Sequence, residues 1–294
     1  QFVLPNSASM VLNRVTGGEM SQLLGVLQSN GQIYLINPQG VIVGPDATID
    51  TAGFVGSTFD VLDRDFIEKM DLLFQGDSTA SIVNLGTIST ATGDVILIAR
   101  NVSNQGQISA PQGTAALGAG AQILLKPTDS QRIYIQPSGL TGDGLGVENS
   151  GNISALFANL QADGQLYAQA IGHSGYIEAL GVAEQNGRVY LVADGGRIDV
   201  TGGLKASAAE MIGALPANDP ETVYGEIRVL GGEIYVTGVE TIDVSNATGG
   251  GFVSLGYEIN PGDTRAKGLV FGTSSTIKAD ATAQGNGGVV AGGG

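Results

Sequence analysis

Short runs of alternating apolar and polar residues recur along the chain and predict β-strands. In these runs the apolar residues stand at every second position, so each segment has one apolar side and one polar side. Val189 and Leu191 share one side of such a run, and Arg188 and Tyr190 share the other. The same period places the following pairs on apolar sides: Val95 and Leu97, Ile198 and Val200, Ile227 and Val229, Ile234 and Val236, and Val253 and Leu255.

The runs are organised in an internal repeat. Segments 83–99 and 103–119 align without gaps at an offset of 20 residues. GQLYAQA at 164–170 returns as GRVYLVA at 187–193, at an offset of 23. One such unit of short strands and Gly or Asn corners cannot bury its apolar side alone and must stack on its neighbours. The sequence therefore predicts an all-β parallel β-helix, a solenoid with coils of ~20–24 residues.

Three asparagines recur at equivalent corners of the repeat. Asn84, Asn104 and Asn149 each precede a glycine by two residues. Stacked amides can hydrogen-bond to one another and to the turn backbone, so we predict a structural ladder of these side chains in preference to a ligand site.

Several segments depart from the strand pattern. Residues 63–74 have apolar residues at helical spacing and predict a short helix lying on the solenoid. Residues 127–148 are rich in loop-forming residues, and residues 204–224 include a predicted helix in KASAAEMIGAL. Such excursions can carry a binding site or cover apolar surface, and the residues alone do not decide between these roles. Residues 20–28 fit a helix begun at Ser21 and a β-coil equally well.

Composition narrows the possible partners. The chain of 294 residues has a formal net charge of −15 and no cysteine. This charge argues against nucleic acid and anionic lipid, because phosphates need basic groups to neutralise them. The absence of cysteine is compatible with passage through an oxidising compartment without disulfide formation. No apolar segment reaches the ~20 residues of a membrane span, and both ends suggest a piece of a longer protein.

The sequence offers little for catalysis. Its single histidine, His173, stands beside glycines, which favours a polar corner residue over a catalytic base. No Ser-His-Asp arrangement or metal-ligand spacing is present. We therefore predict no catalytic residue, no metal and no cofactor. A β-helix polysaccharide lyase or hydrolase is a less favoured alternative, with Asp194 paired with Asp199 or Asp243 as its carboxylates. Another alternative is a structural subunit of an extracellular filament or matrix, whose outward-facing Ile96, Ile98 and Tyr190 would pack between chains.

Residues 11–58 resemble the secretion domain of filamentous-haemagglutinin-type proteins, which are exported by two-partner secretion (TPS). The resemblance rests on the following motifs: Leu12-Asn13-Arg14-Val15, Ser21-Gln22-Leu23-Leu24-Gly25, Asn30-Gly31, Asn37-Pro38-Gln39-Gly40-Val41, and Gly53 with Ser57-Thr58. The family usually has Asn where Gln39 stands, and the first strands of its N-terminal cap are missing here.

The resemblance implies a right-handed parallel β-helix and favours strands over a helix for residues 20–28. It implies a TPS-type secretion domain over residues 1–125 with an incomplete cap. Residues 126–294 would continue the shaft, with excursions at about 127–148 and 204–224. Asn13, Arg14 and the turn Asn37, Pro38, Gln39, Gly40 and Val41 would form the first coils and contribute to partner recognition.

The resemblance also implies a location and a partner. The expected partner is an outer-membrane β-barrel transporter with periplasmic recognition domains. The protein would be secreted or held at the cell surface of a Gram-negative-type bacterium. It would be a non-catalytic adhesin, for which a host receptor, a glycan or a second copy of the chain are the candidate ligands.

Overall fold

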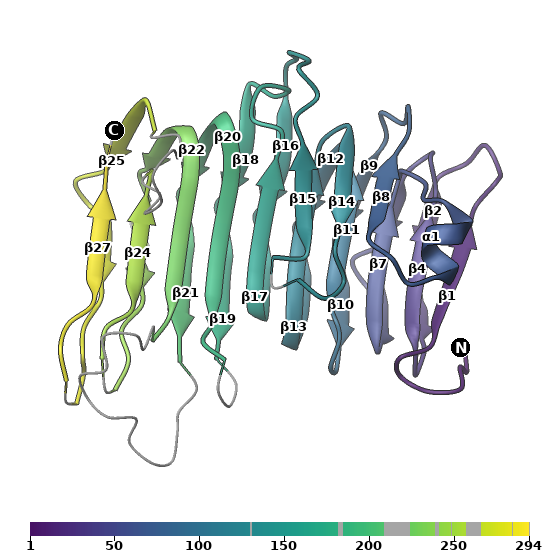
Figure 1. Cartoon of the computed structure of the whole chain (residues 1–294), viewed down its shortest axis with the longest axis horizontal. Coiled ribbons are helices and arrows are strands. Elements are labelled where there is room, and N and C mark those ends of the chain that lie inside the picture. Colours follow the sequence, from purple (N-terminus) through teal and green to yellow (C-terminus); the bar gives the residue numbers. More distant parts are fainter. Residues whose placement is uncertain are drawn as a thin grey trace.

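The computed structural model describes residues 1–129, 131–181, 185–208, 224–238, 241–247, 249–256, 266–283 and 285–293. Its strands stack side by side from the N-terminal to the C-terminal end of a single long row (Figure 1). Within these residues the main sheet contains 24 strands, and neighbouring strands in it run parallel. The parallel β-helix predicted from the sequence is confirmed.

The pairings divide the solenoid into three faces, each of which is a parallel sheet. The first face contains β1 (Met10–Arg14), β4 (Gln32–Ile36), β7 (Gly53–Ser57), β11 (Val95–Ala99), β24 (Phe252–Leu255) and β27 (Val289–Gly292). The second face contains β2 (Ser21–Leu23), β5 (Val41–Val43), β9 (Ser81–Asn84), β12 (Asn101–Asn104), β16 (Leu145–Asn149), β18 (Gln169–His173) and β25 (Gly268–Phe271). The third face contains β3 (Val26–Gln28), β6 (Thr48–Thr51), β10 (Thr87–Thr90), β19 (Tyr176–Leu180), β21 (Gly203–Ser207), β23 (Thr241–Asp243) and β26 (Thr276–Lys278).

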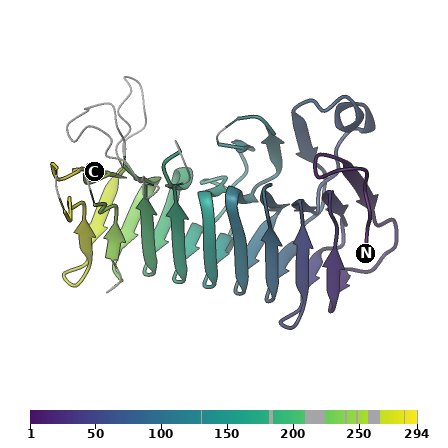
Figure 2. The same ribbon diagram turned by 90° about the horizontal axis from the view of Figure 1, so that it is seen from below.

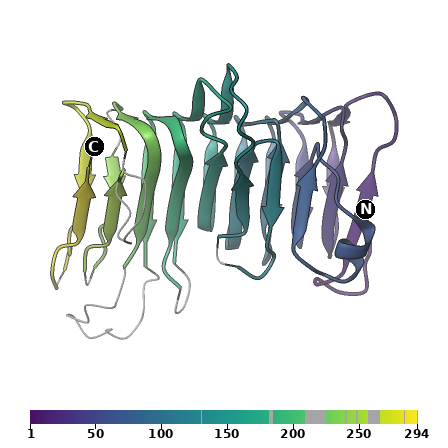
Figure 3. The same cartoon turned by 45° about the horizontal axis from the view of Figure 1, so that its top comes forward.

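Long strands bend around corners and belong to two faces. β13 (Gln107–Ala119) and β17 (Asn152–Ala162) pass from the third face to the first, and their pairing shifts register between Ala110 and Thr114. β20 (Arg188–Val200) and β22 (Glu226–Val236) pass from the first face to the second. These bends carry the chain from one face to the next within the stack (Figure 3).

The interior of the solenoid is filled by the residues that the alternation assigns to apolar sides. Val95, Leu97, Val189 and Leu191 are fully buried in one continuous core. In-register stacking places residues of the same type next to one another. Ile88, for example, pairs with Ile49 and Ile108 on the neighbouring coils. Each coil thus buries its apolar side against the coils above and below it.

A second, antiparallel sheet lies outside the solenoid. It consists of β8 (Leu72–Gln75), β14 (Gln122–Leu125) and β15 (Ile133–Gln136), with β14 in the middle. The helix α1 (Asp63–Ile67) precedes β8. Figure 2 shows α1 and the β14–β15 hairpin on the same side of the row of strands.

The outer sheet covers the outward side of the first face. Its apolar residues form a second core with those of β4, β7 and β11. This core contains Tyr34, Ile36, Val55, Phe59, Val61, Leu72, Phe74, Ile96, Ile98, Ala116, Ile123, Leu125 and Ile133. The prediction that Ile96 and Ile98 lie on the solenoid's surface is therefore wrong, because the outer sheet covers both side chains. Tyr190 remains half-buried and donates a hydrogen bond to Glu226.

The predictions for the segments that depart from the strand pattern are confirmed only in part. The helix predicted in 63–74 is confirmed only over Asp63–Ile67, since Leu72–Gln75 form β8. The loop prediction for 127–148 misses β15 and the first residues of β16. The helix predicted from residue 205 is wrong for its first residues, which belong to β21, and residues 209–223 lie outside the described part. Residues 20–28 form β2 and β3, as the family resemblance implies.

Candidate functional site

The Asn-Pro motif forms a tight turn between the first and second faces. The Gly40 N–H donates to the Asn37 carbonyl oxygen at 3.0 Å, which closes a four-residue turn. Asn at the first position, Pro at the second and Gly at the fourth are preferences of a type I β-turn. Gly40 has φ +107°, and a Cβ there would lie 3.0 Å from the Ser81 carbonyl oxygen. Glycine is therefore required at this position by both backbone conformation and space.

The Asn37 side chain is the centre of the turn. It is fully buried, and its Oδ1 accepts from the Gln39 N–H at 2.9 Å. Its Nδ2 donates to the Glu19 carbonyl oxygen at 3.0 Å and to Ser21 Oγ at 2.9 Å. One amide thus closes its own turn and joins it to the preceding coil, a role that neither aspartate nor alanine can perform fully.

A neighbouring excursion holds the outer side of the turn. Ser78 Oγ donates to the Pro38 carbonyl oxygen at 2.7 Å. Val41 is buried and pairs with Ser21 on one side and Ile82 on the other. The turn is therefore fixed in a stack of three coils.

Asn13 and Arg14 lie beside the strand that leads into this turn. β1 pairs with β4, so Arg14 is opposite Ile36, the residue before Asn37. Asn13 Nδ2 donates to the Tyr34 carbonyl oxygen at 3.4 Å. The structure therefore brings both parts of the family motif onto adjacent coils.

The Arg14 guanidinium holds the segment that leads into α1. It lies 2.7 Å from Asp60 and 2.6 Å from Asp63, and it donates to the Val61 carbonyl oxygen at 2.8 Å. The hydrogen bond with Asp60 raises the pKa of Arg14. Both carboxylates are solvent-exposed, so orientation of the excursion is a larger effect than ion-pair stability.

The strand that follows the turn leads directly to the asparagine column. Val43 of β5 pairs with Asn84, and Asn84, Asn104 and Asn149 occupy equivalent positions on successive coils. Asn84 Nδ2 donates to Asn104 Oδ1, and Asn104 Nδ2 donates to Asn149 Oδ1, each at 2.7 Å. All three side chains are fully buried, so these amides satisfy groups that water cannot reach.

His173 continues the column as its fourth member. Asn149 Nδ2 and His173 Nδ1 are 3.1 Å apart, and His173 Nε2 is 3.1 Å from the Gly203 carbonyl oxygen. Because the carbonyl can only accept, Nε2 carries the ring proton and Nδ1 accepts from Asn149. Burial lowers the pKa of His173 to about 4, which keeps the imidazole neutral. The sequence indicates a polar corner residue here, but it does not place His173 in the column, because the repeat shows Asn, not His, at the equivalent positions.

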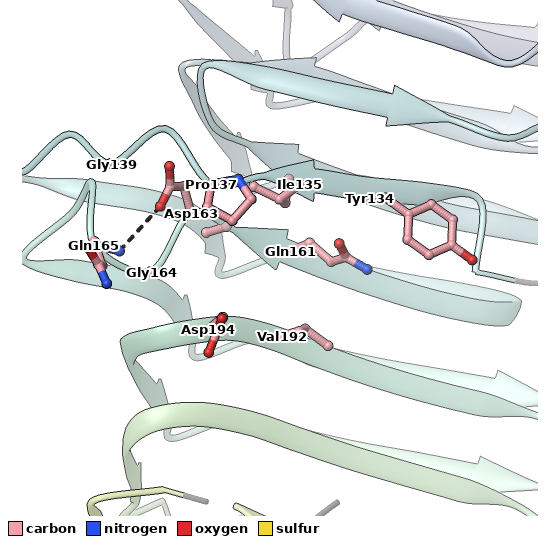
Figure 4. Close-up of a pocket in the computed structure, with 11 residues that line it drawn as sticks. Tyr134, Ile135, Pro137, Gly139, Gln161, Asp163, Gly164, Gln165, Val192 and Asp194 are labelled. Carbon is pink, nitrogen blue, oxygen red and sulfur yellow. Dashed lines mark hydrogen bonds between the residues drawn. The ribbon is translucent and has the colours of Figure 1, made fainter. Parts of the chain in front are cut away.

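The carboxylates weighed for a lyase occupy separate environments. Asp199 pairs with Arg197 at 2.9 Å, and Asp243 Oδ1 accepts from the Ser245 N–H at 2.8 Å. Asp194 lines a surface pocket with Asp163 (Figure 4). In the described ranges, no group of three or more His, Asp or Glu side chains is arranged to hold a metal ion.

Among the helices of the described residues, none has both the length and the apolar character needed to cross a membrane.

A model of the TPS secretion domain matches residues 1–206. A heme/hemopexin-binding protein of Haemophilus influenzae strain Rd is 30% identical over 235 residues, covering 74% of this chain and 25% of that protein. Another H. influenzae heme/hemopexin-binding protein is 44% identical over 61 residues, 21% of this chain and 7% of its own length. The chain thus spans a quarter or less of these curated relatives.

Among solved structures, the crystal structure of the HMW1 secretion domain from H. influenzae matches with a TM-score of 0.78 and 30% identity. The match covers 95% of this chain and 72% of that one. Together with the parallel β-helix, these matches define the class as the secretion module of an exported β-helix protein. The chain belongs to the TPS secretion domain family. Proteins with this domain are exported and are secreted or surface-exposed in Gram-negative bacteria, and the domain implies a TPS-type outer-membrane transporter as partner.

Proposed function

We propose that the chain is the secretion module, with the adjoining part of the shaft, of a non-catalytic adhesin-type exoprotein. The observation that carries the proposal is the uninterrupted parallel stack that includes the Asn37 turn and continues through the asparagine column. A coil in such a stack is stable only when its neighbours are present.

Export and folding are linked by this dependence. The chain would cross the transporter in extended form and fold coil by coil outside, so that each added coil opposes backward movement. The Asn37 turn joins three early coils through its backbone and side chain, and it would therefore be formed among the first elements.

The names of the curated relatives raise heme or hemopexin as ligands. The only histidine, His173, is buried and has both ring nitrogens hydrogen-bonded, so it does not favour heme binding by this part of the protein. The outer sheet covers Ile96 and Ile98, so these residues cannot pack between chains as the filament alternative requires.

Secretion from cells with and without the TPS-type transporter tests the proposal. We expect the wild-type chain in the medium or on the cell surface only when the transporter is present. Equal release without the transporter would contradict the proposed export role.

A pair of variants separates recognition of the turn from its contribution to folding. Asn37→Ala combined with Pro38→Ala changes the turn, whereas Asn104→Ala destabilises the same solenoid elsewhere. Export and the midpoint of thermal unfolding are measured for both. A larger export defect in the turn variant at equal stability supports direct recognition, and equal defects assign the turn to folding alone.

A further inference from the structure

A pocket lies where the outer sheet ends on the first face. Its volume is about 210 Å³, room for ~7 water molecules or one pyranose ring. Residues of β15 and the following loop form one wall, and β17, its corner and β20 form the other. The argument uses Tyr134, Pro137, Gln161, Asp163, Val192 and Asp194 from this lining.

Gln161 is the unusual residue of the pocket. Its column on the first face runs from Ile98 through Gly118 to Gln161 and Val192. Ile98 is covered by the outer sheet, and a Cβ at Gly118 would lie 3.2 Å from Ile133 of β15. Gln161 occupies the next coil, where the cover gives way to the pocket.

The Gln161 side-chain amide lacks a hydrogen-bond acceptor for its N–H groups within the described part of the chain. Its side chain is 3% exposed, yet its Nε2 has no hydrogen-bond partner among the described residues. A buried donor without an acceptor is destabilising, so such a group in a pocket points to a ligand that supplies the acceptor. Figure 4 shows the amide between Tyr134 and the turn that contains Asp163 and Gln165.

The pocket is held open by its own hydrogen bonds. Asp163 Oδ2 accepts from the Ser138 N–H at 2.8 Å and from Ser138 Oγ at 2.6 Å, which ties the loop after β15 to the corner after β17. At the other end, the Lys126 ammonium lies 5.0 Å from the centroid of the Tyr134 ring and orders it. Both walls are therefore positioned before a ligand arrives.

The lining selects the chemical class of the ligand. None of the described side chains that line the pocket is Lys or Arg, and Asp163 and Asp194 make it acidic, which disfavours phosphate, sulfate and acidic sugars. Carboxylates accept from hydroxyl groups, and the amide donates to a hydroxyl or ring oxygen. Tyr134, Pro137 and Val192 supply apolar contact for the C–H groups of a sugar ring.

We propose that this pocket binds one neutral hexose unit, with Gln161 as the hydrogen-bond donor to it. The inference deepens the proposed adhesin role, and it rests on that role for its biological meaning. Sugar binding is measured on the purified chain, so its failure is distinct from a failure of export.

The test is saturation-transfer NMR with the methyl glycosides of glucose, galactose and mannose. Sialic acid, glycerol and methylamine are the comparison ligands. We expect at least one neutral glycoside to bind in the millimolar range, and the three comparison ligands to bind at least tenfold more weakly. Failure of all three glycosides, or equal binding of glycerol, would overturn the assignment, and preferential binding of methylamine would replace the hexose by a cation.

Gln161→Leu is the decisive variant, and Gln122→Leu on β14 is its matched control. Removal of the unpartnered amide is expected to weaken glycoside binding at least tenfold while the thermal midpoint of the free protein rises or stays constant. The control should leave binding unchanged. Unchanged binding in Gln161→Leu would overturn the proposal. If this variant fails to fold, Gln161→Glu, which removes the donor but keeps the shape, gives the same comparison.

Discussion

Asn149 donates a hydrogen bond from Nδ2 to Nδ1 of His173 at 3.1 Å, and this contact joins the asparagine column to the only imidazole of the chain. The proton on Nε2 is directed to the Gly203 carbonyl oxygen. Both ring nitrogens are therefore used in the neutral state, and a second proton would have to displace the bond from Asn149.

His173 should make the stability of the domain depend on pH in the acid range. Its pKa is lowered to about 4 in the folded protein, from an ordinary value of 6.5, so the unfolded chain binds the proton more readily. The stabilising contribution of neutral His173 to the free energy of unfolding is complete above pH 6.5 and is lost as the pH falls towards 4. The free energy of unfolding should change by about 3 kcal/mol over this range because of His173.

His173→Asn tests this prediction, since asparagine can extend the column without titrating. Urea unfolding of the wild type and the variant at pH 7 and pH 4.5 gives the comparison. The difference between the two proteins should grow in favour of the variant at the lower pH. A constant difference would show that His173 is not the titrating group.

Asn104→Ala should destabilise the solenoid by about 2–4 kcal/mol. The change leaves Asn149 Oδ1 without its donor and removes one acceptor from Asn84 Nδ2, both in a fully buried column. Chemical unfolding measures the effect, and Asn152→Ala at an exposed position is the control. Similar small effects in both variants would mean that the ladder contributes little.

Gly40→Ala should cost about 1–3 kcal/mol because φ is +107° and the added Cβ approaches the Ser81 carbonyl oxygen to 3.0 Å. Gly17→Ala is the matched control, since a Cβ at Gly17 would meet no atom within 4 Å. Differential scanning calorimetry of the two variants checks the prediction. Equal midpoints would show that the Asn37 turn tolerates a side chain at its last position.

Ile123→Ala should destabilise the protein by about 2–5 kcal/mol, because Ile123 of the outer sheet is fully buried in the core shared with the first face. Ile67→Ala on α1 should change stability by less than about 0.5 kcal/mol, since Ile67 is 75% exposed. Limited proteolysis should also cleave residues 58–80 and 120–144 faster in the Ile123 variant. Unchanged cleavage would mean that the outer sheet is held by other contacts.

The repeat and the alternation of apolar residues were sufficient to predict the parallel β-helix. Both are local properties, because a strand's two sides are set by every second residue and a coil by its own length. The corner asparagines could be found for the same reason, since an in-register stack places equivalent residues next to one another. The Asn37 turn follows from the fixed φ of proline and the freedom of Gly40.

The tertiary structure alone decided which outward residues are buried. Ile98 and Gln161 occupy equivalent outward positions on the first face, and their strands show nothing that distinguishes covered from open coils. Antiparallel pairing of β8 with β14 joins segments about fifty residues apart, and the resulting outer sheet buries Ile98. Gln161 instead lines the pocket beside the end of β15. His173 likewise joined the asparagine column through a stacking register that its local sequence does not show. Contacts between distant segments depend on the folded arrangement of the whole chain, so the two-residue period of apolar residues cannot predict them.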